Sequence, residues 1–400
     1  MREGCLPNAN KGMVVLIVSV LIQICLGGSM YGWSAYVPAL RQAFAFSAFQ
    51  TNVIFGCTVA FFVFATILGG KWQESWGPRR VALLGSFFYY SGYLLAAFSQ
   101  GNFYAIFIGI ALFSGIAAGL GFVCVMATVP KWFTRNKGFI LGVALAGYGG
   151  GCAVMANYVQ RLFSFDFEIL QVFTIVGLSV GSIYFVSSLF LTCPEIECPH
   201  AKQASQQPYV FTEYSTLIPL FLGMFTGTFG GLIVSGNLVP IGLNAHFSQE
   251  MAVQAITFFA IGNTFGRMMW GHISDKIGWK SIPLCLFMQA LSVACLLFPM
   301  PLYAFYATTF LVGLQYGGNF VLAPAYLTKR FDDRAVGRLY PLILVGFGIA
   351  GFIGPTVGGR IHDIYSTFSY AFVLSVGVAL IGTFVTLCML REKQPKLIQG

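Results

Sequence analysis

The stretch GNTFGRMMWGHISDKIG, residues 262–278, places a charged side chain inside an apolar run. Arg267 stands eight residues before Asp275, in a run that extends from Met251 to Gly271. A guanidinium at the centre of a membrane helix costs about 2.5 to 3.5 kcal/mol to insert, so an arginine at this place needs a chemical reason. A carboxylate ligand supplies one, because guanidinium and carboxylate form a planar bidentate pair. The residue types therefore favour an anion-binding site in apolar surroundings.

The sequence offers Arg267 no obvious counter-ion. A helix rises 1.5 Å per residue, so Arg267 lies about 12 Å from Asp275 and near the middle of a hydrocarbon layer of about 30 Å. The acidic residues stand at the ends of apolar runs or in loops, and none lies deep in a run. Asn263, one turn earlier on the same helix face, is expected to orient the arginine or to contact a substrate. The alternative is that Arg267 snorkels to the headgroups or has a purely structural role.

The composition is that of a polytopic membrane protein. Of the 400 residues, 57% are hydrophobic and 9% are charged, whereas soluble domains carry about 25% charged residues. Apolar runs of about 20 residues, long enough to cross a bilayer, recur along the chain. We therefore expect an all-α membrane protein with twelve transmembrane helices. The predicted spans are 13–37, 49–72, 80–99, 102–129, 138–160, 168–192, 214–245, 250–271, 279–298, 302–326, 337–359 and 368–390.

The basic residues are distributed unevenly over the two sides of this predicted fold. If the N-terminus is cytoplasmic, eighteen of the 22 Lys and Arg fall on the cytoplasmic side, and only Arg41, Arg161 and Arg360 fall outside. This positive-inside pattern predicts a multi-pass protein of the plasma or inner membrane with both termini in the cytoplasm. The formal net charge of +9 is thus a topology signal, and we expect no nucleic-acid partner.

A sequence repeat divides the chain into two halves. GKWQESWGPR, which starts at Gly70, aligns with GHISDKIGWK, which starts at Gly271, at an offset of 201 residues. We expect six spans in each half, with an N-terminal bundle over 1–192, a polar cytoplasmic linker over 193–213 and a C-terminal bundle over 214–400. Parallel repeats of this kind place a substrate site near the membrane midplane, between the halves.

The repeated segment follows the pattern G-x3-[DE]-x2-G-x-[RK], which resembles motif A of the major facilitator superfamily. Other stretches resemble, within that superfamily, the oxalate:formate antiporter and monocarboxylate porter group. The resemblance implies the major facilitator fold, two six-helix bundles with a conformational gate at the motif. The expected gating residues are Gly70, Glu74, Arg79, Gly271, Asp275 and Lys276. The other stretches are YGWSAYVPALRQAF (31–44), KWFTRNKGFILGVALAGYGGG (131–151), the segment 262–278, YGGNFVLAPAYLTKRF (316–331) and GFGIAGFIGP (346–355).

The same resemblance implies a secondary transporter of small carboxylates. In that group the arginine of the eighth helix binds the substrate carboxylate, and it matches Arg267 here. Aromatic residues of the first and fifth helices, and polar and aromatic residues of the tenth, complete the implied site; for each of these, plain packing is the alternative role. The expected substrate-binding residues are Arg267, Asn263, Tyr31, Tyr148, Tyr316, Asn319, Phe320, Phe347 and Cys57.

Three positions depart from the pattern of that group. Phe347 stands where the oxalate transporters carry a lysine of the eleventh helix, and Phe122 stands where they carry a tyrosine of the fourth. Asn263 stands where the animal monocarboxylate porters have an aspartate. The first change leaves one fixed cation and speaks against a dicarboxylate. The last removes the usual proton-coupling carboxylate.

The function expected from these residues is alternating-access transport of a small monocarboxylate such as lactate, pyruvate or formate, by a monomer, coupled to a proton or to a counter-transported anion. An oxalate/formate-type antiporter and a receptor that senses carboxylates without transport are alternatives. An exporter of apolar or cationic drugs is a third, but a lone buried cation without a membrane-embedded acid argues against cationic substrates. We expect neither an enzyme nor a cofactor, because the sequence shows no nucleophile constellation.

Two histidine-containing segments have weaker interpretations. CPEIECPH brings Cys193, Cys198 and His200 together, but the C-x4-C spacing and the missing fourth ligand favour a juxtamembrane loop over a metal site. His246, near the outer end of the seventh span, is placed for proton traffic or for an interfacial role.

Overall fold

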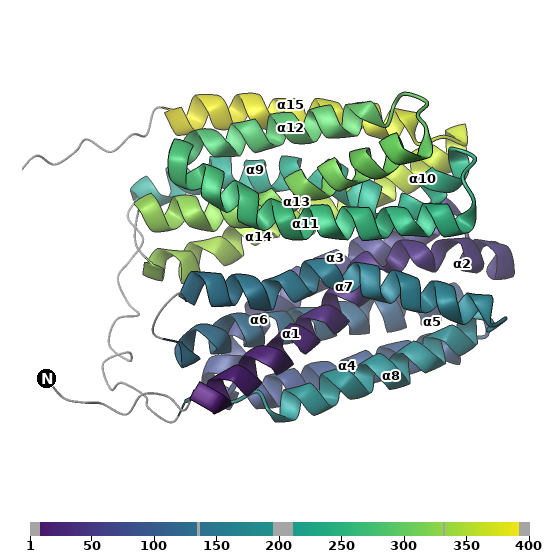
Figure 1. Cartoon of the computed structure of the whole chain (residues 1–400), viewed down its shortest axis with the longest axis horizontal. Coiled ribbons are helices and arrows are strands. Elements are labelled where there is room, and N and C mark those ends of the chain that lie inside the picture. The colour runs from purple at the N-terminus through teal and green to yellow at the C-terminus, as the bar shows by residue number, and fades with distance from the viewer. Residues whose placement is uncertain (1–8, 134–136, 195–210, 331–332, 392–400) are drawn as a thin grey trace, which may run out of the picture.

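The computed structural model of the chain is a bundle of helices that run along one common direction (Figure 1). It describes residues 9–133, 137–194, 211–330 and 333–391, none of which forms a β-strand. Helices suit this apolar sequence, because a bilayer offers no water to backbone N–H and C=O groups and a helix pairs them within one segment. The helices are α1 (Ala9–Tyr31), α2 (Val37–Phe44), α3 (Ala48–Trp76), α4 (Pro78–Ala97), α5 (Phe103–Ile106), α6 (Gly115–Trp132), α7 (Lys137–Ser164), α8 (Ile169–Leu189), α9 (Phe211–Gly236), α10 (Leu238–Asn244), α11 (Gln249–Ile277), α12 (Ser281–Cys295), α13 (Leu302–Arg330), α14 (Asp333–Tyr365) and α15 (Ser369–Arg391).

The predicted spans coincide with these helices to within several residues, and the all-α membrane fold is confirmed. Two spans contain a break: a 3-10 turn at Trp33–Ala35 separates α1 from α2, and Asn237 separates α9 from α10. A π-helical segment, Phe107–Ser114, joins α5 to α6. Among the described residues, eight segments are long and apolar enough to cross a membrane, one of which, Gln249–Cys295, includes both α11 and α12. The other three long helices, α4, α7 and α13, lie outside these eight segments.

The sequence repeat reappears in the backbone geometry. Ser47 caps the N-terminus of α3 and Ser248 caps that of α11, and both helices are 29 residues long. The turns after them contain Gly77 with φ +83° and Gly278 with φ +60°, values that favour glycine. Both pairs keep the offset of 201 residues that the sequence shows.

The two halves lie against each other, α1–α8 in the lower part of Figure 1 and α9–α15 in the upper part. Across the boundary α3 packs on α14, and α7 packs on α11, the helix that carries Arg267. The arginine therefore lies on a helix of the interface between the halves. Most of the predicted linker 193–213 lies outside the described residues, so the domain boundaries stay a prediction.

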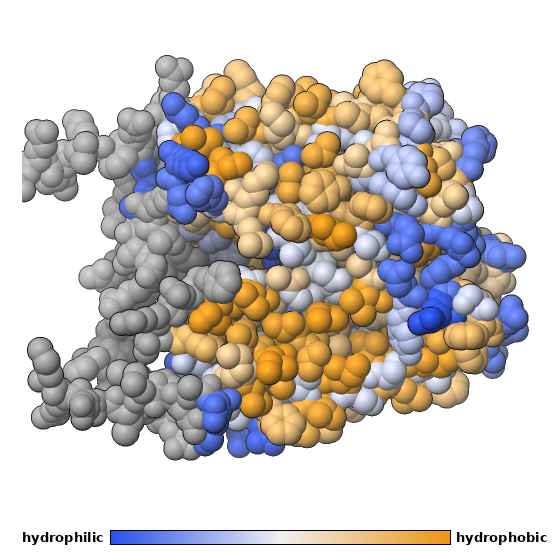
Figure 2. Space-filling model, viewed as in Figure 1, coloured by the Kyte–Doolittle hydropathy of each residue, from blue (hydrophilic) through white to orange (hydrophobic). Residues whose placement is uncertain are grey.

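The outer surface of the bundle is apolar over a broad band, with polar residues gathered at the two ends of the helices (Figure 2). Phe384 of α15 is 69% exposed and Phe87 of α4 is 63% exposed. A soluble protein rarely exposes a continuous apolar surface of this kind to water, whereas lipid tails cover such a surface without a hydrophobic penalty. The band is therefore the membrane-facing surface of a multi-pass protein.

Four glycines allow α11 and α13 to cross closely. A Cβ on Gly262 would meet the backbone carbonyl of Phe310, and one on Gly266 would meet that of Leu314. In return, Gly313 and Gly317 of α13 lie against the backbone of α11. Backbones that approach this closely require small residues, as the Gly262–Gly266 pair predicts. The crossing fixes the side of α11 on which Arg267 emerges.

Candidate functional site

The side chain of Arg267 runs toward the middle of the bundle. Its Nε donates to Oδ1 of Asn263, one turn earlier on α11, at 3.4 Å. Its Cζ lies 5.4 Å from the centroid of the Phe320 ring on α13, within the range of a cation–π contact. This direction leads away from Asp275 at the end of the helix, whereas snorkelling would require the guanidinium to reach toward that end.

The charge of Arg267 has no acidic partner among the residues that the structure describes. Within this part of the chain it contacts the amide oxygen of Asn263 and the aromatic ring of Phe320. The amide nitrogen of Asn263 is fully buried and also lacks a hydrogen-bond partner. Buried polar groups are almost always paired, so the buried amide nitrogen of Asn263 and the half-buried guanidinium of Arg267 are candidate donors to a ligand.

Three buried tyrosines from both halves form a cluster that contacts Phe320, the ring under Arg267. Tyr316 of α13 donates its hydroxyl to that of Tyr31 of α1 at 2.9 Å, which joins the halves. The Tyr31 ring makes edge contacts with Tyr316 and Tyr148, each with centroids 5.7 Å apart. The guanidinium of Arg267 is close enough to interact electrostatically with all three hydroxyls. Tyr31 accepts the bond from Tyr316, so its own O–H is available as a donor.

Phenylalanines complete the surroundings of this polar group. Phe62 of α3 lies 5.3 Å from Phe122 and 6.2 Å from Phe347 between ring centroids, and so connects the halves. Phe347 lies 5.0 Å from Phe320, the ring beneath Arg267. The sequence interpretation did not include Phe62. The predicted site residues Tyr31, Tyr148, Tyr316, Phe320 and Phe347 thus gather around Arg267 and Asn263 in one aromatic cage.

A fourth tyrosine near the arginine was also missed. Tyr340 of α14 donates its hydroxyl to the backbone oxygen of Phe320 at 3.1 Å and interacts electrostatically with Arg267. Its position seven residues, or about two helical turns, before Phe347 on the same interfacial helix is the only sequence signal that points to it.

Two predicted site residues have other surroundings. Asn319 uses its amide nitrogen to donate to the backbone oxygens of Gly227 at 3.2 Å and Gln315 at 3.0 Å, which ties α13 to α9. Cys57 is buried in α3, and no contact joins it to Arg267 in the described part of the chain. A role for either residue in substrate binding stays a prediction.

The predicted gating residues lie at the C-terminal ends of α3 and α11 and at the start of α4. Glu74 and Gly70 stand in the last two turns of α3, and Arg79 stands in the first turn of α4. Gly271, Asp275 and Lys276 occupy the equivalent end of α11. Their gating role stays a prediction.

His246 contacts none of the cage residues in the described part of the chain. His246 follows α10 with φ +63°. Cys198 and His200 lie outside the described residues, within which no group of three or more Cys, His, Asp and Glu side chains could hold a metal ion.

Polar contacts join the two halves near α2 and α10. We call this end of the molecule, on the right in Figure 1, the α2–α10 end. Asn52 of α3 and Asn237 exchange two amide hydrogen bonds, each 2.8 Å long. The hydroxyl of Ser34 accepts from the backbone N–H of Val239 at 2.8 Å. The site is therefore shut off from this end.

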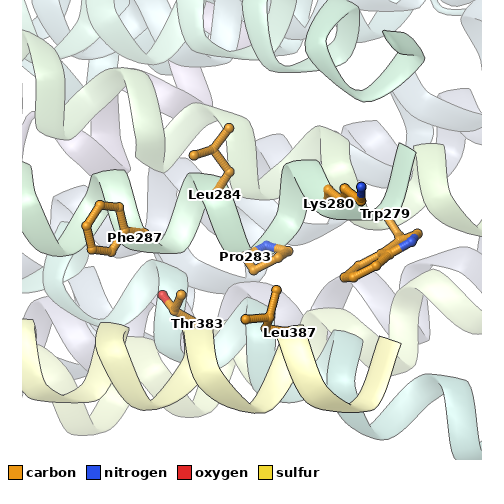
Figure 3. A pocket seen from close by; sticks show the side chains of 7 residues that line it. All are labelled: Trp279, Lys280, Pro283, Leu284, Phe287, Thr383 and Leu387. Atoms are coloured by element: carbon orange, nitrogen blue, oxygen red, sulfur yellow. The ribbon is translucent and has the colours of Figure 1, made fainter. Parts of the chain in front are cut away.

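A groove elsewhere on the surface has no connection with these residues. It lies between α12 and α15 on the outside of the C-terminal half (Figure 3). No predicted site residue lines it, so it is not the candidate site. Its lining residues are Trp279, Lys280, Pro283, Leu284, Phe287, Thr383 and Leu387.

Comparison with known proteins places this geometry in a family. The family model of the Major Facilitator Superfamily matches the chain over residues 19–302 and again over 220–399. The chain is 27% identical to an uncharacterised MFS-type transporter, YhjX, of Escherichia coli, over 84% of this chain and 85% of that one. It is 22% identical to the oxalate:formate antiporter of Oxalobacter formigenes (86% and 84% covered) and 23% identical to human monocarboxylate transporter 11 (95% and 83% covered).

Solved structures show the same fold. The crystal structure of a D-xylose–proton symporter aligns with a TM-score of 0.76 at 13% identity, over 94% of this chain and 97% of the other. That of the nucleoside transporter NupG aligns with a TM-score of 0.70 at 16% identity, over 96% and 100%. The chain, a helical membrane protein with a polar and aromatic cluster between its two repeated halves, belongs to the Major Facilitator Superfamily.

Proposed function

We propose that the protein is a secondary active transporter of small monocarboxylates, of the lactate, pyruvate or formate type, which binds the carboxylate at Arg267. One observation supports this above all: the guanidinium of Arg267 has no acidic partner in the described chain, and it lies over the Phe320 ring, which contacts the tyrosine cluster that joins the halves. The similarity to an oxalate:formate antiporter and to a monocarboxylate transporter agrees with it.

A bound carboxylate would satisfy the unpaired donors of the cage. Its two oxygens accept from the guanidinium of Arg267, and the free N–H of Asn263 and the O–H of Tyr31 are the further donors nearby. Charge-assisted bonds of this kind are about twice as strong as neutral ones. The substrate thus removes the cost of leaving a cation unpaired in apolar surroundings.

The position between the halves suits alternating access. The Tyr31–Tyr316 hydrogen bond and the Phe62–Phe347 contact both cross the boundary, so a ligand that displaces them changes the free-energy difference between conformations. Charge balance permits two forms of coupling, in which a proton accompanies the anion or another anion moves the opposite way.

The apolar contacts of Phe347 favour a single carboxylate. Phe347 contacts Phe62 and Phe320, and it stands where the oxalate transporters that the sequence resembles carry a lysine. The second carboxylate of oxalate would remain charged without a fixed partner there, which is costly. We therefore infer a preference for monocarboxylates over oxalate.

We further propose that the protein resides as a monomer in a plasma or inner membrane with both termini in the cytoplasm. The asymmetry of the basic residues supports this orientation. The α2–α10 end, where Arg41, Arg161 and Arg360 lie, then faces outward.

Uptake into proteoliposomes tests the proposal. The purified protein is supplied with labelled lactate, pyruvate, formate and oxalate, with and without an imposed pH gradient. We expect saturable uptake of a monocarboxylate, and a response to the gradient distinguishes proton symport from anion exchange. If oxalate outcompetes the three monocarboxylates, the protein is an oxalate/formate-type antiporter. Binding without uptake would support a receptor instead.

A further inference from the structure

The N-terminus of α3 is only partly capped by its own half of the molecule. Ser47 Oγ accepts from the backbone N–H of Gln50 at 3.1 Å, and Gln50 Oε1 accepts from the N–H of Ser47 at 2.9 Å, which together form a capping box. The first N–H groups of a helix have no partner within it. Within α3 this leaves the N–H groups of Ala48 and Phe49.

Asp363, at the end of α14 in the other half, supplies both missing acceptors. Its Oδ1 accepts from the N–H of Ala48 at 2.8 Å, and its Oδ2 accepts from the N–H of Phe49 at 2.7 Å. A carboxylate is a strong acceptor, and it also meets the positive end of the α3 dipole. Both oxygens of one side chain are therefore committed to the opposite half.

The internal repeat shows that the fold of the helix does not require such a partner. The equivalent helix α11 begins in the same way, with Ser248 Oγ accepting from the N–H of Met251 at 3.3 Å. No side chain of the opposite half caps the N–H groups of Gln249 and Glu250 in the described chain. The bond to Asp363 thus belongs to the contact between the halves and not to the helix.

Close backbone approach permits this bond. Gly359 lies one turn before Asp363 on α14, and a Cβ there would come within 2.5 Å of the backbone oxygen of Ala48. Any larger side chain at Gly359 would push α14 away from the start of α3. Gly359 and Asp363 lie one turn apart on α14, and both contact the first turn of α3.

We propose that Asp363 and the N-terminus of α3 form a latch that holds the α2–α10 end shut and that opens when the site is exposed to that end. Asp363 is solvent-exposed, whereas the Asn52–Asn237 pair beneath it is buried. Water can therefore replace both bonds as the halves separate, and the latch can release and close again. This role does not depend on which substrate is carried.

Hydrogen–deuterium exchange on the full-length protein tests the latch without any substrate. The readout is the backbone N–H of Val239, which bonds to Ser34 across the boundary and makes no contact with Asp363. We expect Asp363→Asn to speed exchange there by about tenfold, which corresponds to about 1.4 kcal/mol of lost protection. Gly359→Ala should act in the same direction, because it separates the same two turns.

The matched control is Asp166→Asn, which makes the same charge change in the turn between α7 and α8. The Asp166 side chain forms no bond in the described chain, so exchange at Val239 should stay at the wild-type rate. The N–H of Met251 on α11 should be unaffected in all variants. Wild-type exchange at Val239 in Asp363→Asn overturns the proposal, and so does an equal rise at Met251, which would indicate general destabilisation.

Discussion

Arg267 is a charged residue on an interface helix, and it has no acidic partner in the described chain. We expect Arg267→Ala and Arg267→Lys both to abolish carboxylate uptake by a protein that still folds and inserts. Truncating one partner of a buried charge-assisted pair costs about 2 to 5 kcal/mol, or roughly 30-fold to several-thousand-fold in affinity. Lysine fails because an ammonium is a point charge that cannot match the planar fork. The measurement is uptake and binding by each variant at equal expression.

The control for this substitution is Arg161→Lys, at the exposed end of α7, which should transport normally. A snorkelling or merely structural arginine gives a different result, because lysine snorkels equally well. Near-normal uptake by Arg267→Lys would therefore remove the main reason to name a carboxylate substrate.

The tyrosines of the cage are expected to differ in importance despite equal burial. Tyr31 shares a hydrogen bond with Tyr316 across the halves, whereas the hydroxyl of Tyr148 donates only to the sulfur of Met30, at 3.2 Å. Tyr31→Phe removes a donor and an acceptor and should weaken substrate binding by about 3- to 10-fold, the range of one neutral hydrogen bond. Tyr148→Phe, the matched control, should change it less than about twofold. Equal losses for both variants would contradict a donor role for Tyr31.

Some of these residues can be predicted from the sequence and others cannot, for a physical reason. Arg267 is conspicuous because a charge in an apolar run is costly. Phe62 and Tyr340 are not, because 41 phenylalanines and 18 tyrosines serve lipid contact and packing equally well. Asn319 is the opposite case. The sequence points to it as a site residue, but its amide donates to backbone oxygens of α9 and α13. A polar side chain in a membrane helix can thus serve helix packing as readily as a ligand.

At the scale of elements, the crossing of α11 and α13 positions the arginine. Gly266→Ala places a methyl group against the backbone oxygen of Leu314, which cannot move independently of its helix. Overpacking of this kind costs about 1 to 3 kcal/mol, so we expect a lower melting temperature and weaker uptake. Gly150→Ala on α7 is the matched control, because a Cβ there meets nothing within 4 Å. Alanine also has the higher helix propensity, so this variant should melt at or above the wild-type temperature.

The helices themselves are predictable to a greater extent than their interruptions. Length and apolarity locate the spans, because the bilayer sets both. The breaks at Trp33–Ala35 and at Asn237 depend on tertiary contacts instead. Asn237 bonds to Asn52 of the other half, and Ser34 bonds to Val239, so these irregular turns are the places where the halves meet. A single chain segment carries no signal of a partner 185 or more residues away.

At the scale of the whole molecule, the duplication explains both the fold and the location of the site. Two equivalent bundles leave one shared interface, and residues from α1, α7, α11, α13 and α14 meet there. The halves are nevertheless not equivalent in function. Arg267 has Thr66 at the matching position of α3, 201 residues earlier, so the charge is confined to one half. The proposed anion site is therefore asymmetric in a nearly symmetric frame.

The orientation of this frame in the membrane gives the last prediction. The sequence pattern assigns eighteen of the 22 basic residues to the cytoplasmic side, whereas Arg41, Arg161 and Arg360 lie toward the α2–α10 end. The positive-inside rule then requires cytoplasmic termini and a cytoplasmic linker. Reporter fusions at Lys202 and after Lys396 should both read as cytoplasmic, while one in the α7–α8 turn at Asp166 should read as external. An external signal at Lys202 or Lys396 would reverse the molecule and turn the closed α2–α10 end toward the cytoplasm.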